Sequence, residues 1–354
     1  MRVCRGGAPG DLSLGQPGAC AVKPLKAGVI GLGVGEQHLR RYREIAGVEV
    51  QAICDIDPAR LDDIGTRYQV GERHADWRRV TEHPAIDVVS ICSYDDVHAE
   101  QAISAFRHGK HVMVEKPVCL HRHEAEQVLA AQQAAGRLIT SNLILRESPR
   151  FRELRQQIAD GLYGEVFAIE GDYLHEILWK ITEGWRGRMA FYCTLYGGGI
   201  HLIDLMRWLL GQEVTEVAAM GNKVLTRGTA YRFDDSYFTL LRFAGGALGK
   251  CLTTLGPRRS KFHALNVYGS KRTFVNDLPH AKLFVGDRPE DVSAVASAYP
   301  GMRKGDHLPE FVAAIREGRE PPVSCTDVFR VMDICFAAHE AATTGRTIKV
   351  DYLI

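Results

Sequence analysis

The sequence has almost no excess of charge of either sign. Its 44 Lys and Arg residues nearly balance its 43 Asp and Glu residues, which leaves a formal net charge of +1. A protein this close to neutrality has no long-range field with which to collect nucleic acid or an anionic membrane surface. We therefore expect neither nucleic acid nor a membrane among its partners.

Long apolar runs and paired cysteines are also missing. No apolar stretch approaches the roughly 20 residues that a membrane-spanning helix needs. The nine cysteines are scattered, with no C-x-x-C pair and no spacing typical of metal ligands, which argues against a disulfide framework and against a metal site. They are typical of small core residues in a reducing compartment, so we expect a cytoplasmic protein.

The first 23 residues lack the apolar core of a signal peptide and are rich in Gly and Pro. We expect a disordered extension over 1–23, such as an early start codon would add. The apolar fraction of 45% is ordinary for a globular protein, but 354 residues are too many for a typical single core. We therefore expect two domains, over 24–145 and 146–354.

What the sequence does have is a dense glycine turn between two apolar runs. Residues 26–57 read KAGVIGLGVGEQHLRRYREIAGVEVQAICDID. The pattern predicts a strand over 27–32, a tight turn, a helix over 36–46 and a strand over 48–54 that ends in an acid. The glycines of the turn and the acid are Gly31, Gly33, Gly35 and Asp55.

This order of residue types suits a dinucleotide. Glycine permits positive φ and lets a ligand approach where a Cβ would clash. The helix that begins there offers unpaired N–H groups and a positive dipole end to a pyrophosphate. The carboxylate of Asp55 would accept hydrogen bonds from ribose hydroxyls and repel a 2′-phosphate, which favours NAD over NADP. Nearby Arg60 complicates that charge argument, and a tight turn without a ligand is the structural alternative.

The turn departs from the usual G-x-G-x-x-G pattern at its third small position. Glu36 occupies that position and Gly35 precedes it, so close packing of helix against strand must be achieved differently. The expected cofactor contacts from this turn are Gly31, Leu32, Gly33, Val34, Gly35 and Glu36.

Strand and helix patterns alternate through the first half of the chain, which predicts a Rossmann-type doubly wound parallel sheet. The expected strands lie at 86–92, 111–114 and 138–145, and the expected helices at 58–68, 99–108 and 121–135. A ligand of such a sheet lies outside the carboxyl ends of its strands.

After Pro149 the pattern changes to longer alternating segments, which predict an open, mostly antiparallel sheet in a C-terminal α/β domain. Helices would cover one face of this sheet, and a second copy of the chain is the simplest cover for the other, in a homodimer or homotetramer. The expected strands are 165–174, 213–224, 236–243, 248–255 and 263–268, and the expected helices are 151–160, 200–210, 307–317 and 327–343.

Candidate catalytic groups follow two of the predicted parallel strands. The segments 93–98 (SYDDVH) and 115–117 (EKP) begin where these strands end, at the rim of the sheet. A partly desolvated Lys116 there would exchange protons near neutral pH, and Pro117, a candidate for a cis peptide, would fix the backbone beside it. A structural lysine paired with Glu115 or Asp95 is the alternative.

A second constellation reads YGGGIHLID over 196–204. On a helix, His201 and Asp204 share a flank, so the carboxylate could fix the tautomer of the imidazole. The imidazole could then bind a substrate hydroxyl and help to move its proton. The alternative is a buried histidine satisfied by local hydrogen bonds.

The intervening segment 179–196 mixes aromatic and cationic residues without a clear period. A long irregular loop in a compact domain is usually functional or disordered. Its aromatic rings and guanidinium groups suit a sugar ring with an anionic substituent, and a solvated surface loop is the alternative. The candidate substrate contacts are Arg186, Arg188 and Tyr192.

With these motifs in view, the chain resembles the glucose–fructose oxidoreductase and inositol dehydrogenase (Gfo/Idh/MocA) family from Lys26 onward. The stretches that carry the resemblance are GVIGLGVGEQH, AICDID, VVSICSYDDVHAEQAISAFRHGKHVMVEKPVCL, GGGIHLIDLMRWLLG and FVAAIREGREPPVS. The resemblance implies a Rossmann domain and a C-terminal domain whose open sheet mediates oligomers. It also implies hydride exchange between a nicotinamide and a hydroxyl-bearing carbon of a sugar, cyclitol or nucleotide sugar.

The resemblance also implies roles for individual residues. Lys116 and His201 correspond to the family's catalytic lysine and histidine, and Asp55 to its ribose-binding acid. Ser93 and His98, together with Glu115 and Lys116, would border the cofactor. Many members carry an aspartate four residues before the histidine, where this chain has Gly197. A proton relay must then use Asp204, Tyr196 or Tyr192, or Lys116 must act alone.

The sequence therefore predicts an NAD(P)-dependent oxidoreductase acting on a sugar or polyol. Two other functions stay open at this point. One is a glycosidase or lyase that uses held NAD for transient oxidation and elimination. The other is a non-catalytic dinucleotide-binding sensor, which only the missing acid at Gly197 favours.

Overall fold

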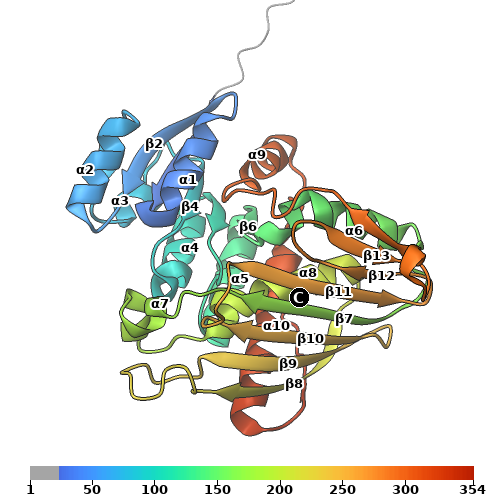
Figure 1. The fold of residues 1–354 in the computed structure, drawn as a ribbon. Helices are drawn as coiled ribbons and strands as arrows, with labels where there is room; N and C mark the ends of the chain where they lie inside the picture. The colour runs from blue at the N-terminus through green and yellow to red at the C-terminus, as the bar shows by residue number, and fades with distance from the viewer. Residues whose placement is uncertain (1–23) are drawn as a thin grey trace, which may run out of the picture.

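The computed structural model describes residues 24–354, so the expected extension over 1–23 lies outside the described residues. The N-terminal part is a six-stranded parallel sheet in the order β3-β2-β1-β4-β5-β6, as the alternation predicted (Figure 1). Its strands are β1 (Leu25–Ile30), β2 (Val48–Cys54), β3 (Glu72–His74), β4 (Val88–Ile91), β5 (His111–Val114) and β6 (Ile139–Ser141).

Helices cross between these strands. They are α1 (Leu32–Arg43), α2 (Pro58–Arg67), α3 (Arg78–Thr81), α4 (His98–Arg107) and α5 (Arg122–Ala135). β3 and α3 are short and have no clear period, which is why the sequence did not predict them. In the centre of the sheet, β4 is buried along its whole length, as a parallel strand covered on both faces should be.

The C-terminal part is a nine-stranded mixed sheet in the order β14-β13-β12-β11-β7-β10-β9-β8-β15. Only β7 and β10 pair in parallel among its described strands. The strands are β7 (Val166–Leu174), β8 (Val214–Asn222), β9 (Ser236–Phe243), β10 (Leu248–Thr254), β11 (Phe262–Gly269), β12 (Thr273–Val275), β13 (Ala281–Phe284), β14 (Val292–Val295) and β15 (Ile348–Lys349). This confirms the predicted open, mostly antiparallel sheet. The sheet has more strands than expected, because β12, β13, β14 and β15 are too short to show a clear pattern in the sequence.

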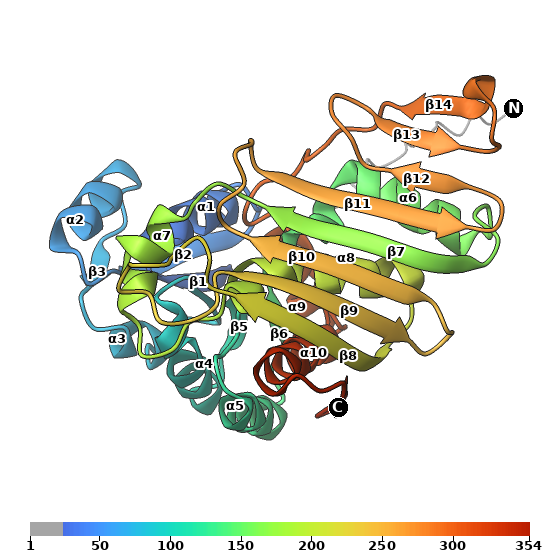
Figure 2. The same cartoon turned by 60° about the horizontal axis from the view of Figure 1, so that its bottom comes forward.

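The helices within residues 24–354 cover one face of this sheet and leave the other bare (Figures 1 and 2). The covering helices are α6 (Pro149–Ala159), α8 (Ile200–Leu210) and α10 (Cys325–Thr344). The helix α7 (Trp179–Thr182) lies in the irregular segment beside the N-terminal domain. No helix among residues 24–354 is long and apolar enough to cross a membrane.

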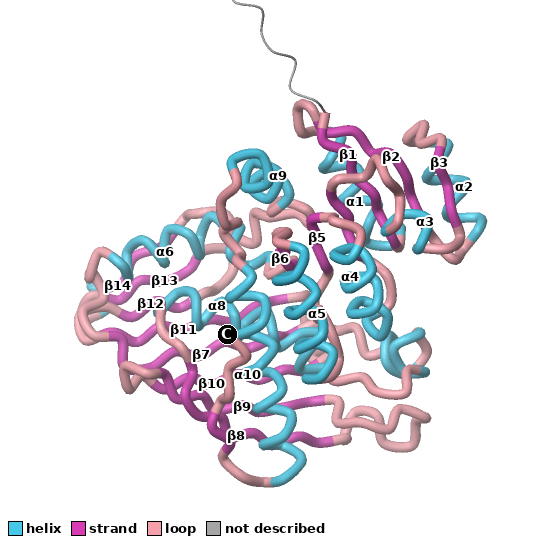
Figure 3. The backbone as a smooth tube through the Cα atoms, turned by 180° about the vertical axis from the view of Figure 1, so that it is seen from behind, coloured by secondary structure: helices cyan, strands magenta, loops and turns pink. Residues whose placement is uncertain are grey.

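The prediction that the helix over 307–317 covers the second sheet is wrong. That helix, α9 (Leu308–Glu317), packs on α1 of the N-terminal domain (Figure 3). Leu308, Phe311 and Val312 share a buried cluster with the strands and helices of that domain. The guanidinium of Arg316 donates to the carbonyl oxygens of residues 46 and 47, each at 2.8 Å. The amphipathic pattern of α9 requires an apolar partner surface but does not identify which surface that is. The domain boundary at 145/146 stays a prediction.

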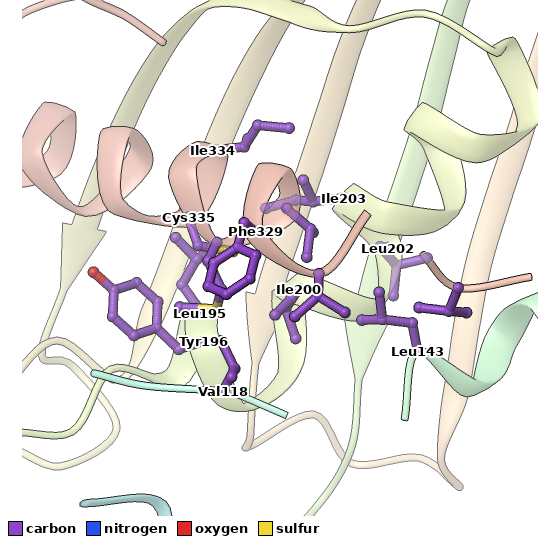
Figure 4. Packing of buried hydrophobic residues seen from close by; sticks show 14 of the residues in the cluster. Val118, Leu143, Leu195, Tyr196, Ile200, Leu202, Ile203, Phe329, Ile334 and Cys335 are labelled. Carbon is purple, nitrogen blue, oxygen red and sulfur yellow. The ribbon is translucent and has the colours of Figure 1, made fainter. Parts of the chain in front are cut away.

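The helix α8 lies at the centre of the main core (Figure 4). Its Ile200, Leu202 and Ile203 are buried between α10 and the connection after β5 and β6, from which Val118 and Leu143 reach the same cluster. Burying an aliphatic side chain contributes about 1.5–3 kcal/mol, so this packing fixes α8 firmly against both domains. The residues that α8 carries therefore have a defined place relative to the rim of the N-terminal sheet.

Candidate active site

The glycine turn joins β1 directly to α1. Gly31 has φ of +81°, and a Cβ there would lie 2.5 Å from the carbonyl oxygen of Cys92. Only glycine fits this position, because the left-handed backbone and the neighbouring strand both exclude a side chain. The helix begins at Leu32, four residues before the predicted start, since Gly33 and Gly35 form its first turn instead of preceding it.

The other two glycines of the turn serve different purposes. A Cβ on Gly33 would meet no atom within 4 Å, and Gly33 lines a cleft of about 670 Å³. A Cβ on Gly35 would lie 2.7 Å from Cγ1 of Val29, so Gly35 allows α1 to pack closely on β1. Gly35 thus provides the close approach that a small residue at position 36 would provide in the usual pattern. Gly33 leaves open space at the helix N-terminus, where a pyrophosphate fits.

Asp55, directly after β2, also lines this cleft. Its carboxylate accepts hydrogen bonds from the backbone N–H of Leu32 (2.7 Å) and of Asp57 (2.9 Å). The guanidinium of Arg60 lies 3.3 Å from both carboxylate oxygens and 3.4 Å from the carboxylate of Asp57. Asp55 is thereby held at the cleft wall with lone pairs left for ribose hydroxyls. The cleft therefore fits a dinucleotide, with Gly31, Gly33, Val34 and Asp55 among its lining residues.

Three of the expected cofactor residues point elsewhere. The carboxylate of Glu36 binds Arg67 (2.7 Å) and Tyr68 (2.9 Å) on the outer side of α1 and lines neither the cleft nor the adjoining cavity. The side chain of Leu32 is buried in the core. The imidazole of His98 contacts the carbonyl oxygens of Pro117 (2.7 Å) and Ser93 (3.3 Å), so it links the backbones of two segments at the rim of the sheet.

A second cavity, of about 360 Å³, continues from the cleft toward the C-terminal sheet. The two spaces share the lining residues Val34, Cys92, Ser93 and Arg186. A ligand lying along the cleft would therefore reach the cavity with one end. We refer to the first space as the dinucleotide cleft and to the second as the substrate cavity.

Lys116 projects into the substrate cavity from the rim of the N-terminal sheet. Its Nζ donates a hydrogen bond to the carbonyl oxygen of Gly197 at 2.7 Å, and the Lys116–Pro117 peptide is cis, as expected. Burial lowers the pKa of the ammonium to about 8; neighbouring Glu115 opposes the shift and Arg186 adds to it. A lysine with this pKa exchanges protons close to neutral pH.

The structural alternative for Lys116 was an ion pair with Glu115 or Asp95. Neither pair forms: within the described residues, Glu115 accepts from Asn142 (2.7 Å) and faces His38 (3.5 Å). Asp95 instead receives two hydrogen bonds from the guanidinium of Arg186, at 3.0 and 3.1 Å. The amine is thus free of a fixed counter-ion.

His201 lines the same cavity from the first turn of α8. Its ring stacks beside Tyr173 and lies edge-on to His263. Burial, followed by the charge of Lys116, holds the pKa of His201 well below its usual range, so the imidazole is neutral. Its Nδ1 has no hydrogen-bond partner among residues 24–354.

The expectation that Asp204 orients His201 is wrong. The carboxylate of Asp204 is held by Arg146, whose Nε donates at 2.8 Å, and Arg146 and Arg207 both bind Asp327 as well. This buried ion network anchors α8 and does not line the substrate cavity. Asp204 lies three residues beyond His201, and the bulky Arg146 on the facing segment attracts its carboxylate away from the imidazole.

Of the tyrosines expected near the relay, only Tyr192 reaches the substrate cavity. Its hydroxyl lies 2.0 Å from the place where a Cβ on Gly197 would be, so it fills the space that a side chain at 197 would use. Burial raises the pKa of Tyr192 well above its usual range, which keeps the phenol protonated. Tyr196 is buried against Phe191 and Phe336 instead and lines no part of the cavity.

The two arginines of the irregular segment have different surroundings. Arg186 lines both the dinucleotide cleft and the substrate cavity, with its guanidinium paired to Asp95 and stacked 4.1 Å over the ring of Trp185. Arg188 is exposed, contacts the carbonyl oxygen of Glu183 at 3.4 Å and lines neither space. Stacking of Trp185 on Tyr94 at 4.3 Å further joins this segment to the N-terminal rim.

Several lining residues were not predicted from the sequence. They come from the end of β7, from α7, from the start of β11 with the residue before it, and from the segment before α9, and they are Tyr173, His175, Lys180, Lys261, His263, Tyr299 and Lys304. A polar His263 at an inward position of an alternating strand was the one available signal, because such a side chain needs a polar environment. Lys180 lies in the segment 179–196, whose mixture of aromatic and cationic residues was a general signal for substrate contacts. Lys261 and Lys304 had no signal, since isolated lysines in loops are common on any surface.

Comparisons with known proteins agree with this geometry. Residues 25–143 match an oxidoreductase family with an NAD-binding Rossmann fold, and residues 151–275 match the Gfo/Idh/MocA C-terminal domain. Myo-inositol 2-dehydrogenase of Thermotoga maritima is 24% identical over 343 residues, which are 93% of this chain and 100% of that one. Inositol 2-dehydrogenase of Burkholderia ambifaria is 30% identical over 226 residues, 63% of this chain and 65% of that one.

Among solved structures, levoglucosan dehydrogenase in complex with NADH and levoglucosan superposes with a TM-score of 0.84 at 23% identity, covering 93% of this chain and 99% of that one. This similarity concerns the fold. Both halves of the chain match the family in the expected order, and the dinucleotide cleft has the form that its N-terminal half requires. The chain therefore belongs to the Gfo/Idh/MocA family of oxidoreductases, with an NAD-binding Rossmann domain at its amino-terminal end.

Proposed function

We propose that this protein oxidises a hydroxyl-bearing carbon of a sugar or cyclitol with NAD, or catalyses the reverse reduction. The observation that carries the proposal is the junction of the two spaces. The cavity that adjoins the dinucleotide cleft is lined by both Lys116 and His201, each without a carboxylate partner in the described chain. The relatives named inositol 2-dehydrogenase and the levoglucosan dehydrogenase of similar fold support a polyhydroxylated substrate.

The residues would act on the proton of the substrate hydroxyl. NAD, when bound, supplies a nicotinamide that accepts hydride. The Lys116 amine, deprotonated above a pKa of about 8, accepts the hydroxyl proton as the carbon is oxidised. The neutral His201 imidazole holds the hydroxyl oxygen by a hydrogen bond. The protonated phenol of Tyr192 can donate a further hydrogen bond at the position left free by Gly197.

We propose NAD as the preferred cofactor and NADP as the less favoured one. Asp55 is buried at the cleft wall and would face the ribose, where a carboxylate repels a 2′-phosphate. Arg60 is already occupied by Asp55 and Asp57, so its charge is largely neutralised at that point. A thermal-shift comparison of NAD, NADP and their reduced forms tests this, because a ligand that binds only the folded state raises Tm according to its affinity.

The central experiment is a substrate screen with NAD at saturation. We expect NADH to accumulate with at least one sugar or cyclitol, and no accumulation across a broad panel contradicts the proposal. A glycosidase or lyase using transient oxidation would instead release a cleaved product without net NADH, and a sensor would bind the dinucleotide without turnover. Neither alternative is supported by the comparisons.

We further propose that the bare face of the nine-stranded sheet binds a second copy of the chain, in a dimer or tetramer. β9 points Phe238 and Leu240 outward, 51% and 58% exposed, and Met220 of β8 beside them is 80% exposed. Adjacent exposed apolar side chains on a bare sheet face are typical of an interface. Light scattering after chromatography should report more than one chain per particle for wild type and a monomer for Phe238→Asp/Leu240→Asp. A monomeric wild type contradicts the proposal.

We propose a cytoplasmic location on the basis of the cysteines. The seven in the described residues are all free, and six are buried. Unpaired cysteines are typical of a reducing compartment. Cell fractionation against compartment markers tests this assignment, and recovery outside the cytoplasmic fraction contradicts it.

A further inference from the structure

The substrate cavity carries a strong excess of positive charge in a protein that is nearly neutral overall. Five cationic side chains line it, and only two carboxylates do, those of Asp95 and Glu115. The cations are Lys116, Lys180, Arg186, Lys261 and Lys304. The three histidines of the lining add no charge, because burial lowers the pKa of His175 to about 4 and of His263 to about 3, and holds that of His201 well below its usual range.

The two carboxylates cannot balance the lysines, because other groups already bind them. Asp95 receives both of its close hydrogen bonds from Arg186. Glu115 is buried, accepts from Asn142 at 2.7 Å and faces His38 at 3.5 Å. Within residues 24–354, no carboxylate lies within 4 Å of any of the four lysine amines.

Lys116 is accounted for by its place at the proposed reacting hydroxyl, but the other three lysines are not. Lys180 is half-buried in α7, whereas Lys261 and Lys304 reach the cavity from exposed positions in loops. Burial lowers the pKa of Lys180 to about 8, with the charges of Arg186, Lys304 and Lys261 adding to the shift. Lys261 lies at the surface, but desolvation of its amine where the side chain lines the cavity, followed by the charge of Lys304, lowers its pKa. The lysines therefore repel one another across the cavity.

Mutually repelling ammonium groups around a concave site destabilise the empty protein and concentrate an anion there. We propose that the substrate is an acidic sugar or polyol, whose carboxylate or phosphate is bound by Lys180, Lys261 and Lys304 while its hydroxyl faces Lys116. This inference rests on the proposed function and narrows its substrate class. A carboxylate and a phosphate ester share the chemistry that three lysines recognise, and matched compounds distinguish them.

The competing assignment for these lysines is the pyrophosphate of the cofactor. The helix N-terminus that would bind the pyrophosphate belongs to the dinucleotide cleft, and none of the three lysines lines that cleft. Gly305, next to Lys304, lies against Arg41 and Gln37 in the middle of α1, away from its first turn. The Kd for NADH measured in lysine variants separates the two assignments.

The test uses sets of compounds that differ only in the charged group: D-glucose, D-glucuronate and D-glucose 6-phosphate, and the corresponding galactose series. For each compound, NADH formation and the Tm of the NADH-saturated protein are measured. We expect one acidic member to have kcat/KM at least about tenfold above its neutral partner and to raise Tm more. Equal or better performance of the neutral sugars overturns the proposal.

Variants then assign the preference to individual side chains. Lys180→Gln, Lys261→Gln and Lys304→Gln should each raise KM for the acidic compound roughly tenfold, with little change for the neutral one. Lys180→Arg keeps the charge and should retain the preference. Lys282→Gln, which removes an exposed lysine outside the cavity, is the matched control and should behave as wild type. Unchanged discrimination in all three Gln variants, or a weaker Kd for NADH as their only effect, overturns the proposal.

The proposed function and this inference can fail separately. If only neutral sugars are oxidised, the enzyme is a dehydrogenase and the acidic substrate class is wrong. If no compound is oxidised, the proposed function fails on this panel, and the Tm data alone decide the inference. A larger Tm increase with the acidic compound than with its neutral partner, lost in Lys180→Gln, then supports an anion site. If the acidic compound raises Tm no more than its neutral partner does, the proposed anion site is wrong.

Discussion

The dinucleotide cleft is built largely from neighbouring stretches of one domain, whereas the substrate cavity collects side chains from both domains. The cleft takes its key residues from the β1–α1 turn and the end of β2. The cavity draws on the rim of the first sheet, the segment around α7, the start of α8 and loops near β11 and α9. Their charges also differ, because the cleft wall carries Asp55 and Asp57 against Arg60 and Arg186, while the cavity carries mainly lysines.

This difference separates two kinds of recognition. The cleft binds through backbone N–H groups and space that only glycine leaves open, so its ligand is set by the fold. The cavity binds through side chains on segments that can vary without disturbing either sheet. We therefore expect substitutions in the cleft to change cofactor affinity and substitutions in the cavity to change turnover or substrate choice. Four experiments test this separation, and the largest effect is expected for the proton acceptor in the cavity.

Replacing the cavity's proton acceptor should have the largest effect. Lys116→Met removes the amine and keeps the length of the side chain, so turnover should fall by about two to four orders of magnitude. The Kd for NADH, measured by fluorescence titration, should stay within about twofold of wild type because the cleft is intact. Wild-type turnover in this variant removes Lys116 from the proposed role.

The pH dependence should report the same amine. Below its pKa of about 8, Lys116 is protonated and cannot accept the hydroxyl proton, so kcat/KM for oxidation should fall about tenfold per pH unit. Above that pKa the rate should reach a plateau. In the direction of reduction, the protonated amine is the active form and the dependence reverses. A profile that is flat between pH 6 and 8 in both directions contradicts the assignment.

Two glycines of one turn should respond differently to substitution. Gly33→Leu places a side chain in the open cleft and should weaken NADH binding about tenfold or more while Tm changes little, since no protein atom lies within 4 Å of the new Cβ. Gly31→Ala is the comparison variant: its positive φ and the contact with Cys92 should cost roughly 1–3 kcal/mol of stability and lower Tm. Equal Tm values for the two variants would show that the turn is not built as described.

Asp55→Asn should have the smallest effect. The amide keeps one acceptor oxygen, which serves the backbone N–H of Leu32 or of Asp57 but not both, and it removes the negative charge that faces the ribose. The Kd for NAD should rise about fivefold, and the Kd for NADP should rise less or fall. The preference for NAD, measured as the ratio of the two Kd values, therefore decreases. An unchanged ratio would mean that Asp55 does not select between the cofactors.

The difference between the dinucleotide cleft and the substrate cavity also explains which site residues the sequence could predict. Gly31, Gly33, Asp55 and Lys116 stand at ends of strongly patterned strands, so their place follows from the parallel sheet alone. Lys180 stands in the short helix α7 and Lys261 and Lys304 stand in loops, and their convergence depends on how two sheets pack, which no local pattern encodes. In addition, two residues on one flank of a helix need not bind each other, and the prediction that Asp204 orients His201 is wrong for this reason.

The same limit applies to whole elements. The sequence shows the apolar stripe of α9 but not the surface on which the helix packs, because any apolar face of suitable shape can bury such a stripe. The apolar stripe of α8 does pack on the predicted sheet, but the sequence pattern alone did not distinguish α8 from α9 in this respect. Local propensity therefore determined which segments are helical, and tertiary packing determined what they contact.

The hydrogen bond from Lys116 to the carbonyl oxygen of Gly197 has a consequence for how the amine works. An ammonium group has three N–H bonds and a neutral amine has two, so either form can donate one of them to this carbonyl. Loss of a proton then exposes a lone pair without releasing the nitrogen from its anchor. The base can pass through every stage of a catalytic cycle at one fixed location, and structures determined on either side of its titration should superpose at that atom.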